Sequence, residues 1–188
     1  MNTSIRKDLL QQAEKLFSTE GYLATSLEDV AVLLDVPVES LDLDKDDLLW
    51  ASASKIADAF HTALDDVLAV QRPVDDRLRH AMMAHINVIV ENLAAANVYM
   101  HEWRYLSPER MEIYIQRRDA YEERFREIVK EGIYAGIFAP VDEKFATLMM
   151  LSALNWVSQW YREEGPMTAI DIAHTLTDLT LNGLYRRV

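Results

Sequence analysis

The stretch from Ser26 to Leu49, SLEDVAVLLDVPVESLDLDKDDLL, constrains the fold of this chain more than any other. Ser26 is followed three residues later by Asp29, a shortened capping box that begins a helix running through Leu34. Pro37 suits the first position of a further short helix, which reads PVESL and ends at residue 41. The stretch therefore predicts a small bundle of short helices joined by a tight turn.

Helical spacing of apolar residues continues through the rest of the chain. Asp44 with Asp47 caps a long helix that reaches about Val70, and Thr168 with Asp171 begins the last helix. The further helices predicted are 4–20, 74–96, 98–106, 108–135, 142–161 and 168–185. The predicted fold class is therefore all-α.

The composition excludes several classes of protein. No apolar run approaches the ~20 residues that span a bilayer, and residues 1–12 lack the apolar region of a signal peptide. The chain has no cysteine, which excludes disulfides and thiolate metal sites. These observations predict a cytoplasmic protein with no membrane partner.

The negative charge of the chain is concentrated near its N-terminus. The net charge is −12, and residues 1–50 contain 4 basic and 11 acidic side chains. Most non-specific affinity for nucleic acid comes from lysine and arginine side chains that neutralise phosphates. The charge distribution therefore argues against passive adhesion to nucleic acid.

Residues 5–51 resemble the N-terminal domain of TetR-family transcriptional regulators. The resemblance rests on RKDLLQQAEKLFSTEGYLATSLEDVAVLLDVPVESL followed by KDDLLWA, which keeps the family's LF…GY helix end and its T-S pair. It implies a TetR-like fold with a helix-turn-helix domain at 1–50 and a ligand-binding and dimerisation domain at 51–188. The tracts HEWRYLSPER and LNWVSQWYR also resemble the ligand domain of regulators of fatty-acid and lipid degradation.

The sequence departs from the family pattern at the DNA-reading helix. Family members have an aromatic YYHF-type segment between the leucine that corresponds to Leu41 and the K-E-x-L helix. Here that segment is shorter and contains only DLD, so that Lys45 is flanked by Asp42, Asp44, Asp46 and Asp47. We therefore predict a shortened, acidic reading helix.

The resemblance also implies a set of DNA-contacting residues. Those that correspond to backbone contacts are Thr25, Ser26 and Lys45. Those that would face base edges in the major groove are Pro37, Val38, Glu39 and Ser40. Glu39 can accept from a cytosine amino group, but this helix has no arginine for guanine and no asparagine or glutamine for adenine.

Soft and aromatic side chains predict a small-molecule pocket in the larger domain. They lie on helices that surround a cavity in the family: Met82, His85, Met100, Trp103, Met149 and Trp156. Methionine adapts to irregular apolar ligands. The implied effector is an apolar or amphipathic small molecule, such as an acyl-CoA. The alternative for each residue alone is ordinary core packing.

The two C-terminal helices predict a homodimer. Residues 145–161 are apolar nearly all the way round the helix, and the last helix is similarly broad. Two such helices from each copy can cover one another across a two-fold axis. The predicted interface residues are Leu151, Leu154, Trp160, Leu176 and Leu179. The alternative is a monomer that buries both helices in its own core.

The sequence contains no recognisable catalytic motif. It has no G-x-S-x-G, H-E-x-x-H or phosphate loop, and its histidines lack the spacing of metal ligands. We therefore predict no enzymatic activity, no cofactor and no metal. Two interpretations stay open. One is a ligand-responsive transcriptional regulator acting as a homodimer, with a shortened DNA-reading helix. The other is a TetR-fold ligand-binding or protein-interaction module that no longer binds DNA.

Overall fold

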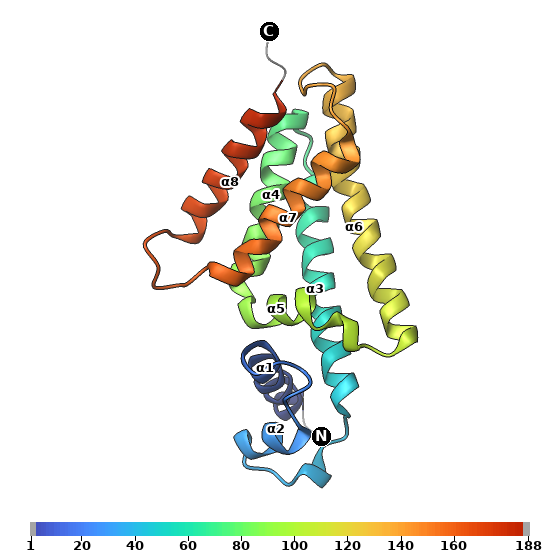
Figure 1. Ribbon diagram of the computed structural model, residues 1–188, viewed down its shortest axis with the longest axis vertical. Coiled ribbons are helices and arrows are strands. Elements are labelled where there is room, and N and C mark those ends of the chain that lie inside the picture. The colour runs from blue at the N-terminus through green and yellow to red at the C-terminus, as the bar shows by residue number, and fades with distance from the viewer. Residues whose placement is uncertain (1–2, 186–188) are drawn as a thin grey trace. The chain divides into compact units, whose positions relative to one another are not determined.

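The computed structural model describes residues 3–185, which form eight α-helices and two 3₁₀ turns (Figure 1). In chain order they are α1 (Thr3–Thr19), α2 (Leu27–Leu33), η1 (Val38–Ser40), α3 (Lys45–Leu68), α4 (Val74–Glu91), α5 (Leu93–His101), η2 (Trp103–Tyr105), α6 (Pro108–Tyr134), α7 (Glu143–Trp160) and α8 (Ala169–Leu184). The prediction of an all-α fold is confirmed. Within residues 3–185, no helix combines the length and apolar character that a membrane span needs.

Contacts group the chain into two compact units. The first unit combines residues up to Ala57 with Asn92–Gln116. The second combines Asp58–Glu91 with the residues from Arg117 onward. Residues 92–116 therefore pack with the N-terminal helices, although they lie far from them in the sequence. The division into domains 1–50 and 51–188 stays a prediction.

In the first unit, α1 packs against both α2 and α5. After α1 the chain passes through Gly21, whose φ of 89° is a left-handed conformation that glycine adopts at little cost. The buried apolar side chains of this unit include Leu9, Ala13, Phe17, Val30, Ala31, Leu48, Leu49, Ala53 and Ala96. This core supports the segment that resembles a helix-turn-helix.

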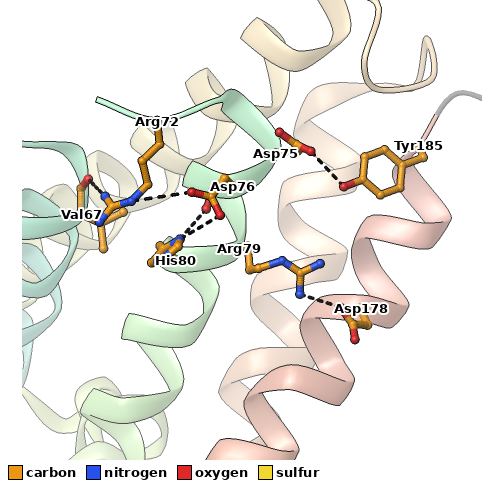
Figure 2. A network of polar contacts seen from close by, with 8 residues as sticks. All are labelled: Val67, Arg72, Asp75, Asp76, Arg79, His80, Asp178 and Tyr185. Carbon is orange, nitrogen blue, oxygen red and sulfur yellow. Dashed lines mark hydrogen bonds and ion pairs between the residues drawn. The ribbon is translucent and has the colours of Figure 1, made fainter. Parts of the chain in front are cut away.

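In the second unit, α4 packs against α7 and α8. Two polar contacts anchor α8 to α4, as Figure 2 shows. Arg79 binds the Asp178 carboxylate at 2.6 Å, and the Tyr185 hydroxyl donates to the Asp75 carboxylate at 3.1 Å. One residue within α8 and one residue just after its end therefore both bind α4.

A close approach at the end of α6 depends on Gly132. A Cβ at this position would lie 2.1 Å from the ring of Phe138, so a larger residue would displace that buried ring. The Phe138 N–H donates to the Gly132 carbonyl at 3.0 Å. Phe138 also forms an isolated bridge with Tyr185, which links the end of α6 to the end of α8.

The structure corrects two of the predicted helices. The sequence predicted helices over 74–96 and 98–106, whereas α4 ends at Glu91 and α5 begins at Leu93. Asn92 between them has φ −133° and ψ 42°, outside the helical region, which interrupts the helix. Residues 103–105 then form the 3₁₀ turn η2. The break was missed because apolar residues continue at close spacing on both sides of Asn92.

Candidate functional site

The helix-turn-helix segment begins at Ser26, which caps α2. The Asp29 N–H donates to the Ser26 hydroxyl oxygen at 3.1 Å, and the Ser26 N–H donates to the Asp29 carboxylate at 2.8 Å. The Ser26 hydroxyl also donates to that carboxylate at 2.7 Å and is the main cause of an Asp29 pKa below its ordinary value. The predicted capping box is therefore confirmed.

The turn after α2 passes through a left-handed residue. Asp35 has φ 53°, a conformation that costs a non-glycine residue roughly 1–2 kcal/mol. Where the sequence predicted a helix over 37–41, the structure has only the 3₁₀ turn η1, and Pro37 precedes that turn as its N-cap. Proline at this position is extended, with ψ 137°, because the turn begins one residue later.

A second capping box begins α3. The Asp47 N–H donates to the Asp44 carboxylate at 2.7 Å, and the Asp44 N–H donates to the Asp47 carboxylate at 3.1 Å. Two of the aspartates near Lys45 therefore cap the N-terminus of α3, as the sequence predicted. Acidic groups at this end of a helix also interact favourably with its dipole.

Arg110, near the beginning of α6, binds both Asp46 and Asp47. The hydrogen bond with Asp47 is the main cause of a raised Arg110 pKa, and the same bond holds the pKa of Asp47 below its usual range. The negative charge around Lys45 is therefore partly compensated. The local sequence offered no sign of this pairing, because Arg110 lies 64 positions after Asp46.

Lys45 rests on an aromatic ring. Its ammonium group lies 4.1 Å from the centroid of the Tyr22 ring, a cation–π arrangement. Tyr22 in turn stacks on Tyr105, with ring centroids 5.5 Å apart. Partial burial lowers the pKa of Lys45. The lysine that the resemblance assigns to a DNA phosphate thus has an intramolecular partner in this structure.

The other residues assigned to DNA differ in their exposure. Thr25 is buried, and its hydroxyl donates to the Gly21 carbonyl at 2.9 Å. Pro37, Glu39 and Ser40 are exposed, and Val38 is half-buried. Their contacts with bases or phosphates stay predictions.

A groove of about 460 Å³ lies between α1 and α2, within the first unit. Its lining residues are Leu16, Glu20, Ala24, Thr25, Asp29, Val32 and Leu33. Val32 and Leu33 are 76% and 53% exposed. The sequence offered one signal for this surface: the run VAVLL at residues 30–34 has more aliphatic side chains than one face of a short helix can bury.

A polar cluster lies in the core of the second unit. His85 on α4 is buried, and its Nε2–H donates to the Asn155 carboxamide oxygen at 3.0 Å. Its Nδ1 accepts from the Tyr121 hydroxyl at 3.0 Å, an assignment that follows from the neutral ring and its partners. The ring also stacks on Phe60, with centroids 4.5 Å apart. Burial lowers the pKa of His85 to about 4, so the ring is neutral near pH 7.

The six residues predicted to line a ligand pocket fall in different surroundings. Met82 and His85 are buried in the second unit. Met149 and Trp156 are 55% and 61% exposed on α7. Met100 and Trp103 belong to the first unit and are half-buried, and Trp103 stacks on Tyr114 with centroids 5.4 Å apart. A shared pocket stays a prediction.

An exposed apolar face runs along α7, with the large side chains Phe145, Met149, Trp156 and Trp160. Helix α8 also exposes large apolar side chains, among them Ile170 and Leu179. Of the residues predicted for a dimer interface, Trp160 and Leu179 are exposed, and Leu176 is half-buried. Leu151 and Leu154 instead pack inside the chain's own core. The exposed face of α7 is thus the side opposite those two leucines.

Comparisons with known proteins identify the family. A family model described as tetracyclin repressor-like, C-terminal domain, matches residues 71–184. The TetR family transcriptional regulator PfmR from Thermus thermophilus is 34% identical and has a TM-score of 0.86, over 95% of this chain and 99% of PfmR. The chain belongs to the TetR family of transcriptional regulators. The predictions of a TetR-like fold and of a non-enzymatic regulator are therefore confirmed.

Two other proteins of known structure have a similar fold. The HTH-type transcriptional repressor KstR2 of Mycobacterium tuberculosis is 24% identical over 97% of this chain and 94% of the repressor. The structure of KstR2, a ketosteroid transcriptional regulator, has a TM-score of 0.93 and covers 100% of this chain. AibR, solved with isovaleryl coenzyme A and operator DNA, has a TM-score of 0.83 at 24% identity, over 92% of this chain and 96% of AibR.

Proposed function

We propose that this TetR-family chain is a ligand-responsive transcriptional regulator that acts as a homodimer through the exposed face of α7 and α8. The preserved helix-turn-helix frame carries the proposal, because two capping boxes and a left-handed turn position α2 and η1 ahead of α3. Base reading by η1 is weak, because its three residues supply no arginine, asparagine or glutamine.

The effector is an apolar or amphipathic molecule with an acyl-CoA as its model. AibR binds isovaleryl coenzyme A, which supports this class. In the second unit, a neutral, hydrogen-bonded histidine contacts the rings of Phe60, Tyr121 and Phe125. Met82 and Met150 are buried in the same unit. Thermal unfolding in the presence of isovaleryl-CoA, a long-chain acyl-CoA and free CoA tests the proposal. We expect acyl-CoA to raise the midpoint more than CoA does. Equal effects of all three would contradict an acyl-specific site.

DNA binding is tested by fluorescence anisotropy with a duplex from upstream of the gene and a duplex of random sequence. Because most of the affinity would rest on phosphate contacts, we expect it to fall steeply between about 50 and 200 mM salt, with a modest preference for the upstream duplex. Lys45→Ala should weaken binding to both. A flat salt dependence would exclude this mode.

The homodimer is tested by sedimentation velocity and by the spacing of the two η1 turns in a dimer structure. Reading of adjacent major grooves requires a spacing of about 34 Å. A monomer at micromolar concentration would exclude the proposed arrangement.

The second candidate is a TetR-fold ligand-binding or protein-interaction module that no longer binds DNA. At the position assigned to the reading helix the chain has the 3₁₀ turn η1, which carries the exposed Glu39, and this favours the second candidate. The anisotropy and thermal-unfolding experiments together separate the two candidates. The module should bind an acyl-CoA but neither duplex at low salt, whereas the regulator should bind both an acyl-CoA and DNA.

A further inference from the structure

The groove between α1 and α2 exposes aliphatic side chains to water. Val32 and Leu33 line it, and the exposed Leu23 is next in the chain to the lining residue Ala24. Single exposed apolar residues are common, but several that gather around a concave surface mark a binding site. The lining belongs entirely to the first unit, so the groove is complete within it.

The groove is acidic as well as apolar. Glu20 and Asp29 are part of the lining, and Glu28 and Asp35 are exposed near the two ends of α2. Among the described residues of the lining, none is a lysine or an arginine. The pKa of Asp29 lies below its ordinary value because Ser26 donates two hydrogen bonds to it, so its charge is present at neutral pH. The groove lining therefore combines aliphatic side chains with carboxylates.

This combination discriminates between occupants. Duplex DNA would bring phosphates against Glu20 and Asp29, and it offers few apolar groups to cover Val32 and Leu33. A second copy of the same groove would oppose the same carboxylates across a two-fold axis. A cationic polypeptide with an apolar stripe meets neither obstacle.

We propose that the groove between α1 and α2 docks a basic amphipathic helix of a partner protein. Apolar residues at i and i+3 or i+4 of that helix contact Leu16, Val32 and Leu33. Its lysine or arginine side chains reach Glu20 and Asp29 in the groove lining. This interaction goes beyond ligand-responsive regulation and does not require that the chain bind DNA.

The test uses the full chain and a fluorescein-labelled helical peptide of leucine and lysine, with leucines at i, i+3, i+4 and i+7. A peptide of the same composition in scrambled order is the control for charge alone. We expect the amphipathic peptide to bind at least about tenfold more tightly than the scrambled one, because only it presents a continuous apolar stripe. Methyl NMR should show shifts at Leu16, Ala24, Val32 and Leu33.

Matched variants assign the site. The double variant Val32→Ser with Leu33→Ser should weaken peptide binding about tenfold, since both side chains are exposed and the fold does not depend on them. Ile113→Ser alters an exposed residue of the first unit outside the groove lining and should leave the affinity unchanged. Glu20→Gln should weaken binding at low salt.

Three outcomes would overturn the proposal. Equal affinity for the scrambled peptide would show that binding depends on charge alone and not on an apolar stripe. Methyl shifts confined to the exposed face of α7 and α8 would place the peptide there. Displacement of the peptide by duplex DNA, with a weaker duplex affinity in the Val32→Ser, Leu33→Ser variant, would assign the groove to nucleic acid. Failure of the chain to bind any duplex would leave the proposal standing.

Discussion

The exposed apolar face of α7 and α8 and the groove between α1 and α2 differ in size and in charge. The first is broad and aromatic, with Trp156 and Trp160 on one helix and Leu179 on the other. The second is short, and its lining combines aliphatic side chains with carboxylates. Aromatic residues dominate the energetics of protein interfaces, and two copies of a broad apolar surface can cover one another. Acidic groups in the lining instead oppose self-pairing and favour a basic partner. Exposed hydrophobic surface alone therefore does not specify the partner.

The largest expected effect comes from charging the α7–α8 face. Trp156→Glu places a carboxylate in both copies of the proposed interface. We expect the dimer dissociation constant to rise about 1,000-fold, roughly 4 kcal/mol, as measured by sedimentation velocity. Leu33→Glu, an equally drastic change in the groove, should leave dimerisation unchanged. If both variants weaken the dimer alike, the two surfaces do not have separate partners.

Acid should destabilise the second unit through His85. The folded pKa of about 4 lies below the ordinary 6.5, so the unfolded chain binds more protons between these values. The contribution of His85 to the free energy of unfolding is therefore fully present above pH 6.5, and the free energy falls by about 3 kcal/mol as the pH drops to about 4. Urea unfolding of the native chain and of His85→Gln measures this difference.

The matched control for His85 is Tyr121→Phe. This variant removes one hydrogen bond to the ring but keeps the titrating group. Its free energy of unfolding should therefore be lower at all pH values, but should change with pH as steeply as in the native chain. If His85→Gln also keeps the native slope between pH 4 and 6.5, the histidine is not the cause. Because Asn155 belongs to α7, the same acid range should weaken the dimer before it affects the groove.

Two equivalent capping boxes allow the two surfaces to be perturbed separately. Ser26 caps α2 beside the groove, and Thr168 caps α8 beside the proposed dimer face, with hydroxyl–carboxylate distances of 2.7 Å in both. Each change to alanine should cost about 1 kcal/mol in urea unfolding. Ser26→Ala should reduce only peptide binding, and Thr168→Ala only dimerisation. An identical pattern for the two variants would indicate a global loss of stability.

The smallest expected effect is that of salt. Raising sodium chloride should weaken binding of the leucine–lysine peptide about two- to threefold, because exposed ion pairs are worth ~0.2–1 kcal/mol and are screened. Dimerisation through the α7–α8 face should not weaken. Peptide affinity that rises with salt would show that Glu20 and Asp29 contribute nothing to the groove's selectivity.

Local chemistry made much of the fold predictable. The capping boxes at Ser26 and Thr168 and the end of α1 near Gly21 rest on hydrogen bonds and backbone angles within a few residues. The break at Asn92 was not predictable, because apolar spacing continues across it and no side-chain cap marks it. In the candidate site, the capping boxes at the beginnings of α2 and α3 were predicted. The pairing of Arg110 with Asp46 was not, because it depends on packing between segments far apart in the sequence.

Periodicity, charge and motifs in the sequence alone indicated a helical chain with an acidic N-terminal part and a resemblance to the TetR family. It also indicated that α7 is apolar nearly all the way round. Which side of α7 faces inward became clear only from its packing: Leu151 and Leu154 are buried, and Met149 and Trp156 are exposed. The hydrophobic effect is non-directional, so the sequence of an apolar helix does not specify which of its faces is buried. A helix that is apolar all round acquires an inside and an outside only from the helices packed against it.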